Sequence, residues 1–377
     1  MAAARVLGAL PAYGHRNTAA NIRQAIEDWL LRNPLVSAIW GPNHQNYLGN
    51  NWVGAWYLGH GSYGLCGLWV RLDANQNVVD RMVVKACTPG HTRWNLPDMW
   101  PFGNPPAVGV GPPREAHVHF NMRHNNNHPR NSHILRNFAH WVHPQFGTVY
   151  KLYLQYVSHQ SLDELIKKHI RGITSPGLTR TRRRNILLPE PFCWYLFESL
   201  ATAAVRMLEA FQRLPLGVPA ILLGPQVIHQ DMKYTNVLLD APDSTYCRCY
   251  PVPYLSDFGG ARVTTYFDNQ NPGHLVVDES TDGFWPPEHP NAPDNQINLA
   301  RERNIFAANI WQIGMIMLSV VNLTDEMNVE QPDFGTIPAW APTFSQAAQR
   351  NYSLELRELI ESCLVLQPFQ RPDPETC

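Results

Sequence analysis

Apolar and polar residues alternate along residues 52–85 in three short runs. A glycine-rich stretch separates the first two runs, and the sequence Asp73-Ala74-Asn75-Gln76-Asn77 separates the second from the third. Alternation with a period of two, bounded by turn-forming residues, is typical of strands that bury one face. The pattern therefore predicts three consecutive antiparallel strands.

Longer apolar segments replace this alternation farther along the chain. Residues 192–214 contain no Gly or Pro and predict a buried helix, and the apolar run 305–321 predicts another. Shorter helices are expected to begin near Pro113 and after Ser161, where helix-starting residue types occur. The other expected elements are strands over 146–150 and 151–157 and loops over 88–113 and 172–187.

A β-rich first part followed by a helix-rich second part predicts an α+β fold with two lobes. The small, antiparallel β-rich lobe is expected over about residues 51–155 and the larger α-helical lobe over about residues 158–377. Residues 1–50, with one helix candidate over 18–31, are expected to form an N-terminal appendage.

Composition narrows the functional classes. Lys and Arg total 30 and Asp and Glu total 31, so the net charge of −1 gives no overall field that attracts nucleic acid or anionic lipid. No window of about 20 residues is uniformly apolar, so neither a membrane span nor a signal peptide is expected. The seven Cys follow no disulfide or zinc spacing. We expect an intracellular protein, cytoplasmic or nuclear, with no nucleic-acid or membrane partner.

The first motif that can carry chemistry is a glycine run between two expected strands. It consists of Leu58, Gly59, His60, Gly61, Ser62, Tyr63, Gly64, Leu65 and Cys66. Its G-x-G-x-x-G spacing also occurs in dinucleotide-binding folds and in ordinary turns. A dinucleotide site needs a helix after the last Gly, whereas a strand is expected here, so the glycines are placed at the tip of a hairpin.

A single Lys ends the third expected strand. Lys85 follows the apolar residues Met82, Val83 and Val84, and a lone Lys in such a place is ordinarily exposed to solvent. A functional role needs a carboxylate partner, which Glu115 supplies at the expected start of the next helix. In such a pair, the carboxylate of Glu115 could hold the ammonium of Lys85 against nucleotide phosphates.

The most specific motif lies in the second half of the chain. His229, Asp231, Lys233 and Asn236 occur at fixed offsets between two apolar segments, and Asp257-Phe258-Gly259 follows another apolar segment. Phosphoryl transfer needs a carboxylate near the acceptor hydroxyl, cations at the phosphates and oxygen ligands for Mg²⁺. These residue types match that requirement.

The order and spacing of these blocks resemble the eukaryotic-type protein kinase family over about residues 52–377. The resemblance implies the bilobal kinase fold and transfer of the γ-phosphoryl group of ATP, with Mg²⁺, to serine or threonine hydroxyls of protein substrates. It assigns proton acceptance to Asp231, charge compensation to Lys233, phosphate binding to Lys85 with Glu115, and Mg²⁺ binding to Asn236 and Asp257. It also assigns ATP contacts to residues 58–66 and to the backbones of Gln155 and Val157.

Further positions fit the resemblance. It implies that Thr281 contacts Asp231 and Lys233, a pattern of the serine/threonine class, and that Glu288 pairs with Arg371. Asn309 replaces an Asp that anchors the catalytic loop, and the amide is expected to be a weaker anchor. Gln230 replaces an Arg that receives the phosphate of a modified activation segment, so little dependence on that phosphate is expected. This loop, which lacks the Arg, resembles those of filamentous fungal kinases.

Two other functions stay open. A pseudokinase would keep the fold and bind nucleotide as a scaffold, but no catalytic position is lost here. A small-molecule kinase of related fold usually lacks the segment that ends in Glu288.

The basic cluster 180–184 could bind an acidic partner, although a solvated loop is the simpler interpretation. His124 and His128 are four residues apart, but they flank a run of Asn in an expected loop, and no carboxylate or Cys completes a metal site. The histidines between 117 and 133 are therefore interpreted as surface or capping residues.

Overall fold

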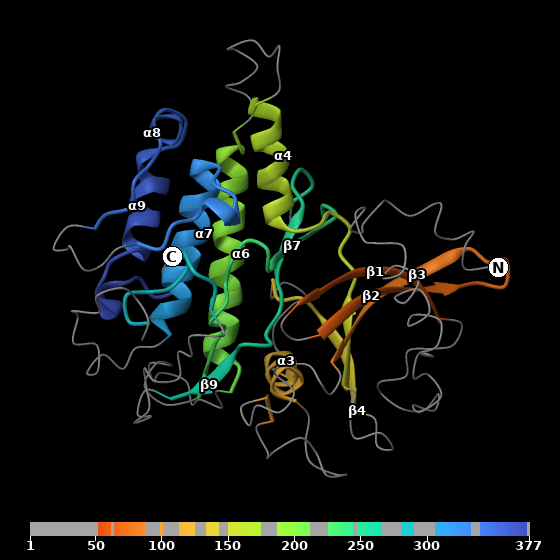
Figure 1. Cartoon of the computed structure of the whole chain (residues 1–377). Coiled ribbons are helices and arrows are strands. Elements are labelled where there is room, and N and C mark those ends of the chain that lie inside the picture. The colour runs from red at the N-terminus through yellow and green to blue at the C-terminus, as the bar shows by residue number, and fades with distance from the viewer. Residues whose placement is uncertain are drawn as a thin grey trace. The chain divides into compact units, whose positions relative to one another are not determined.

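The computed structural model in Figure 1 describes twelve segments of the chain. They are residues 52–61, 64–87, 99–100, 113–124, 133–142, 150–174, 187–211, 225–243, 247–265, 280–289, 306–332 and 340–374. The expected appendage, the basic cluster 180–184 and most of the expected loop 88–113 lie outside them. Mixed helices and antiparallel sheets make up the described part.

The chain divides into two compact units, which we describe separately. The first unit takes its residues from the chain up to His119 and from Arg136–Tyr156, and the second from Phe120–Leu135 and from Val157 onward. The first unit is built on an antiparallel sheet in the order β1-β2-β3-β5-β4. Its strands are β1 (Trp52–Gly61), β2 (Gly64–Leu72), β3 (Val78–Cys87), β4 (Asn137–Val142) and β5 (Tyr150–Gln155).

The three strands expected from alternation are therefore confirmed as β1, β2 and β3. Asp73 closes the β2–β3 turn, because its Oδ1 accepts hydrogen bonds from the backbone N–H groups of Asn75 and Asn77, both at 2.8 Å. Ala55, Leu68, Val70 and Leu72 form a buried cluster on this sheet. Period-two alternation thus placed one face of the hairpin in the core.

Strand β4 of this sheet was not predicted from the sequence. The strand expected over 146–150 lies outside the described residues except for Tyr150, which belongs to β5. The additional strand is β4, at the sheet edge beside β5. Helix α3 (Arg114–His124) begins in the first unit, close to the expected start, with Glu115 in its first turn.

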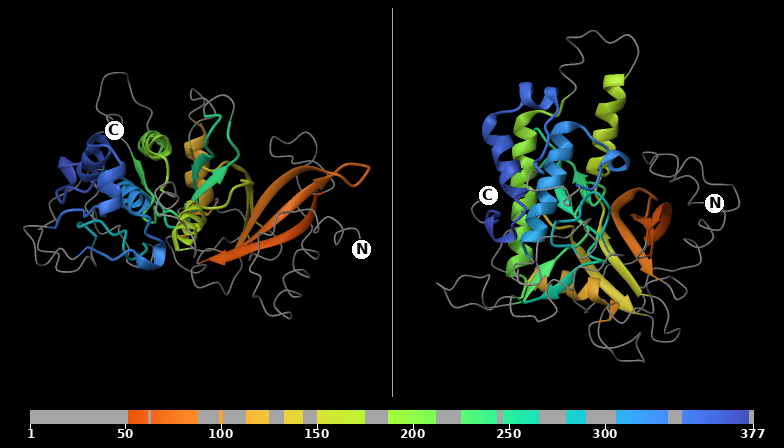
Figure 2. Two further views of the ribbon diagram at one scale, coloured as in Figure 1. Left: turned by 90° about the horizontal axis from the view of Figure 1, so that it is seen from above. Right: turned by 60° about the vertical axis from the view of Figure 1, so that its left-hand side comes forward.

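The second unit is mainly helical. Its helices are α4 (Leu162–Thr174), α6 (Glu190–Glu209), α7 (Ala307–Asn322), α8 (Gln346–Asn351) and α9 (Leu354–Cys363), with 3-10 turns η6 (Glu326–Asn328) and η7 (Pro368–Gln370). Helices α6, α7 and α9 run side by side in both figures (Figures 1 and 2). Helix α6 ends at Glu209, short of the expected 214, and α4 extends into the expected loop 172–187.

Helix α7 lies at the centre of this unit. All fifteen of its residues from Ala307 to Val321 are buried, including the polar residues Asn309 and Gln312. A helix that is apolar on all sides belongs in a core, so each buried polar residue needs a hydrogen-bonding partner. Two short sheets pair β6 (Gln226–Ile228) with β9 (Arg262–Thr264), and β7 (Val237–Asp240) with β8 (Val252–Leu255).

Among the described residues, no helix has the length and apolar character needed to cross a membrane.

Candidate active site

Lys85 and Glu115 form a buried ion pair in the first unit. Lys85 lies on β3, where its register partners are Cys66 on β2 and Leu152 on β5. Its Nζ is 2.9 Å from each carboxylate oxygen of Glu115, and the two residues are 6% and 1% exposed. A buried charge requires such a partner. The contact expected from the sequence is therefore present, and Lys85 is not the solvent-facing residue of the simpler interpretation.

The glycine run forms the end of the β1–β2 hairpin, as expected. Gly61 is the register partner of Gly64, and Gly59 is the partner of Cys66, whereas Ser62 and Tyr63 lie outside the described residues. Gly64 has a φ of +141°, and a Cβ there would lie 2.5 Å from the carbonyl oxygen of Ala86. This close backbone approach requires Gly.

The flanks of the run differ in their surroundings. Leu58 packs against the buried cluster of the first unit, while Leu65 and Cys66 are half-buried on β2. The side chain of His60 is outside the described part of the structure.

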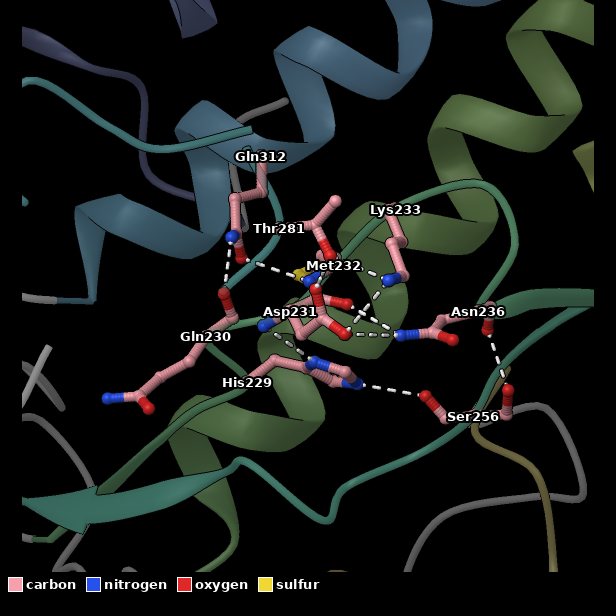
Figure 3. Close-up of polar contacts among 9 residues, drawn as sticks. All are labelled: His229, Gln230, Asp231, Met232, Lys233, Asn236, Ser256, Thr281 and Gln312. Atoms are coloured by element: carbon pink, nitrogen blue, oxygen red, sulfur yellow. Dashed lines mark hydrogen bonds and ion pairs between the residues drawn. The ribbon is translucent and has the colours of Figure 1, made fainter. Parts of the chain in front are cut away.

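Figure 3 shows the polar contacts around Asp231, in the segment from Val227 to Asn236, which we call the Asp231 loop. Thr281 donates from Oγ1 to Asp231 Oδ1 at 2.6 Å, and Lys233 Nζ donates to the same Thr281 Oγ1 at 2.6 Å. Lys233 Nζ is also 3.3 Å from Asp231 Oδ2. Asn236 Nδ2 donates to that Oδ2 at 3.2 Å and to the Asp231 backbone carbonyl at 2.8 Å. The four residues thus form one hydrogen-bonded cluster in the second unit.

The Asp231 carboxyl is harder to ionise than an ordinary Asp. Burial raises its pKa most, and the nearby negative charge of Asp257 raises it further. Lys233 and the Thr281 hydroxyl oppose this rise by stabilising the carboxylate. The site therefore holds a proton-accepting group close to a second carboxylate.

Asp257 and Asn236 are the two expected metal ligands. Asp257 has a left-handed backbone with a φ of 62°, and its charge acts on both Asp231 and His229. Asn236 is tied to Asp231, and its backbone carbonyl accepts hydrogen bonds from Ser256 N at 2.9 Å and Oγ at 2.8 Å. Carboxylate and amide oxygens are the ligand types of Mg²⁺. The donor set and its excess negative charge fit that ion, although a cluster of three or more His, Cys, Asp or Glu is absent from the described residues.

His229 supports the Asp231 loop as a neutral ring. It is fully buried, and burial lowers its pKa to about 4. The ring Nε2 lies 3.0 Å from the Ser256 carbonyl and the ring Nδ1 lies 3.3 Å from the backbone N of Asp231. These partners assign the proton to Nε2, which donates, while Nδ1 accepts. The Phe258 ring lies 4.6 Å away, centroid to centroid.

Helix α7 contacts the Asp231 loop through two amide side chains. Asn309 accepts from His229 N and donates to Val227 O, both at 3.0 Å. The anchor expected at Asn309 is thus present, and it makes a second bond that a carboxylate could not make. Gln312 accepts from Met232 N at 3.2 Å and donates to Gln230 O at 2.7 Å.

Sequence reasoning missed Gln312. The available signal was a single Gln three residues after Asn309, in a run otherwise apolar enough to be buried on all sides. It also missed Gln331, whose Oε1 accepts from Gly283 N at 3.0 Å and Trp285 N at 3.1 Å. Nothing in the spacing of Gln331 distinguishes it from other loop residues.

Glu288 and Arg371 form the expected ion pair. Arg371 donates from Nη1 and Nη2 to the two carboxylate oxygens at 2.5 and 2.7 Å. Nη1 also donates to the carbonyl of Ala307 at 2.9 Å, and the guanidinium lies 5.1 Å from the centre of the Trp311 ring. Glu288 and Arg371 are both buried, so this pair fixes the end of the 280–289 segment to α7 and to the region that follows α9.

The expected adenine contacts fall on either side of the division between the units. Gln155 ends β5, and its N–H donates to the carbonyl of Arg136 at 2.8 Å. Val157 is buried at the start of a segment of the second unit.

Comparisons with known proteins point to protein kinases. The chain is 23% identical over 249 residues to the G2-specific protein kinase nimA of Emericella nidulans, covering 60% of the chain and 29% of that protein. It is 23% identical over 284 residues to the G2-specific protein kinase nim-1 of Neurospora crassa, covering 70% and 27%. It is 25% identical over 278 residues to the leucine-rich repeat receptor protein kinase EMS1 of Arabidopsis thaliana, covering 60% and 21%.

The chain thus spans less than a third of each of these relatives. No family model matches the chain. These distant similarities support a protein kinase domain in the chain.

Proposed function

We propose that the chain is an ATP- and Mg²⁺-dependent serine/threonine protein kinase with the bilobal fold of that family. The cluster of Asp231 with Thr281, Lys233 and Asn236 carries the proposal. In it, a carboxylate, an ammonium group, a hydroxyl and a side-chain amide meet, which are the kinds of group that phosphoryl transfer to a hydroxyl uses.

Each group has a distinct task under this proposal. Asp231 orients the acceptor hydroxyl and takes its proton, and Lys233 offsets negative charge on the transferred phosphoryl group. Thr281 holds both of these side chains in place. In the first unit, Lys85 binds the α- and β-phosphates of ATP, and Glu115 orients the Lys85 ammonium. The backbone of residues 58–66 and those of Gln155 and Val157 bind the nucleotide.

Asn236 and Asp257 would hold Mg²⁺. When bound, the ion neutralises charge on the phosphates. Burial is the main cause of the raised pKa of Asp231, and the nearby Asp257 charge adds to it; a cation held by Asp257 would compensate that charge.

Transfer of radiolabelled phosphate from ATP to a mixture of Ser- and Thr-containing peptides tests the proposal. We expect labelling by the parent and a loss of about 10²–10⁴-fold for Asp231→Asn, because the variant keeps the shape but cannot accept the proton. Asp80→Asn is a matched control, since Asp80 is an exposed residue paired with Arg71 on the sheet of the first unit.

Equal labelling by the parent and Asp231→Asn would contradict the proposal. If the parent and Asp231→Asn both bind ATP but neither transfers phosphate to peptides, a pseudokinase function replaces the proposed kinase function. Labelling of a small molecule in place of peptides would indicate a small-molecule kinase of related fold.

A further inference from the structure

The amides of Asn309 and Gln312 lie one turn apart on α7 and contact consecutive parts of the Asp231 loop. Together they make four hydrogen bonds, and each side chain serves one backbone N–H and one backbone carbonyl. The two residues are at most 1% exposed. We call this pair the amide clamp.

The pattern of partners requires amides at both positions. A carboxylate accepts but cannot donate, so it would leave Val227 O or Gln230 O facing a negative charge. An apolar side chain would leave both a buried N–H and a buried carbonyl without a partner, which costs about 1–3 kcal/mol for each group. An amide satisfies both in one side chain without needing to bind a proton.

Gln312 holds the two peptide groups that flank Asp231. The carbonyl of Gln230 belongs to the peptide bond before Asp231, and the N–H of Met232 belongs to the one after it. Fixing both peptide planes fixes the backbone dihedrals of Asp231 and therefore the direction of its side chain. Gln230 itself has a left-handed φ of 69°, a conformation that a non-Gly residue keeps only when its surroundings impose it.

We propose that Gln312 is a positioning residue that sets the orientation of the Asp231 carboxylate through the backbone, with Asn309 anchoring the start of the same loop. The inference rests on the proposed function, in which Asp231 accepts the proton of the substrate hydroxyl. Figure 3 shows Gln312 reaching from α7 to the backbone on both sides of Asp231.

Gln312→Glu provides the central test, because it changes one donor into an acceptor without changing the size. The ionised Glu repels Gln230 O, whereas the protonated Glu donates to Gln230 O and accepts from Met232 N as the amide does. We expect kcat at pH 8.5 to fall about 10–100-fold with KM for ATP within about threefold of the parent, since small displacements of a catalytic group have effects of this size.

The ratio of variant to parent kcat should then rise as the pH is lowered, because a buried Glu becomes protonated at a higher pH than usual. Gln312→Leu should lose a similar factor with no dependence of the ratio on pH. Gln346→Glu is the matched control, because it places the same charge on the exposed face of α8 and should match the parent at every pH.

Amide hydrogen exchange tests the clamp without any activity. We expect the Met232 amide to exchange at least about tenfold faster in Gln312→Leu than in the parent, with α6 unchanged, because an unclamped N–H opens more readily. Should the parent show no transfer while Met232 responds in this way, the proposed function fails and the clamp stands.

Unchanged exchange at Met232 overturns the inference. The inference is also overturned if Gln312→Glu lowers the thermal stability but leaves kcat per folded molecule equal to that of the parent. Gln312 would then stabilise the fold without positioning Asp231.

Discussion

His229 and His289 are fully buried in the second unit, and burial lowers the pKa of each to about 4. His229 uses its neutral form to bridge Ser256 and Asp231, and His289 stacks on the Trp285 ring at 4.8 Å with the planes 11° apart. Both positions tolerate an uncharged imidazole and oppose a charged one.

Acid should therefore destabilise the second unit. A histidine whose pKa is lower when folded binds protons first in the unfolded chain, so stability is lost as the pH falls from about 6.5 toward 4. Between pH 7.5 and pH 5, each histidine should remove about 2 kcal/mol from the free energy of unfolding, which urea titrations at both pH values would measure.

His289→Phe is the matched variant, because Phe can keep the ring contact with Trp285 but cannot titrate. It should lose about half of the pH dependence. A parent whose unfolding free energy is constant over this range would contradict the neutral assignment of both rings.

The raised pKa of Asp231 predicts the acid limit of activity. The carboxylate is the active form, and it is lost as the pH falls through the raised pKa, so kcat should decline at a higher pH than for an ordinary Asp. Thr281→Val removes a hydroxyl that stabilises the carboxylate and should move this acid limit to still higher pH. A pH profile of kcat measures both, and an unmoved limit in Thr281→Val would show that the hydroxyl does not tune Asp231.

The β1–β2 hairpin depends on two glycines with different surroundings. Both Gly59 and Gly64 have positive φ values, but a Cβ at Gly59 meets no atom within 4 Å, whereas one at Gly64 meets the backbone of β3 at 2.5 Å. The strain of positive φ is therefore common to both positions, and the collision belongs to Gly64 alone.

Gly64→Ala should destabilise the first unit more than Gly59→Ala does. Overpacking against a backbone atom costs about 1–3 kcal/mol, so we expect a difference of at least about 1 kcal/mol in the free energy of unfolding. Urea unfolding of the two variants, followed through the tryptophans of this unit, measures the difference. Equal losses would show that β3 moves away without cost.

The ion pair of Glu288 with Arg371 joins two segments 83 residues apart in the chain. Removing either partner leaves a buried charge alone, so Arg371→Met should destabilise the second unit by about 3–5 kcal/mol. The double variant Glu288→Gln with Arg371→Met should lose clearly less than the sum of the single losses. Additive losses in the unfolding free energies would show that the two residues do not interact.

An element could be predicted from the sequence where a pattern of residue types marks it, and not where only its backbone contacts define it. Strands β1 to β3 were predictable because apolar residues recur at every second position, and those such as Leu68, Val70 and Leu72 lie together in a buried cluster. Strand β4 was not predicted, and its place in the sheet is established by its backbone pairing to β5. The candidate site divides in the same way: motif residues such as Asp231 were found by type and spacing, whereas Gln312 acts through backbone groups that no motif encodes.

Contacts among the chain's own side chains build the candidate site in each unit. The first unit holds the pair of Lys85 with Glu115, and the second holds the Thr281 cluster and the pair of Glu288 with Arg371. Gln230 is buried and neutral, so it offers a phosphate no charged partner.

Phosphorylation between residues 263 and 281 should therefore change turnover little. We expect the unphosphorylated and phosphorylated proteins to differ in kcat by less than about tenfold, since an Arg that would couple the phosphate to Asp231 is replaced by Gln. Kinetic comparison of the two purified forms checks this expectation. A rise of about a hundredfold or more on phosphorylation would overturn it.

The late position of Arg371 has a consequence for synthesis on the ribosome. Glu288 is made 83 residues earlier, and at about 5–20 residues per second the interval is about 4–17 s. Throughout that time the Glu288 carboxylate lacks the cation that makes its burial favourable. Closing the second unit around Glu288 is thus unfavourable until Arg371 has left the exit tunnel and can pair with it.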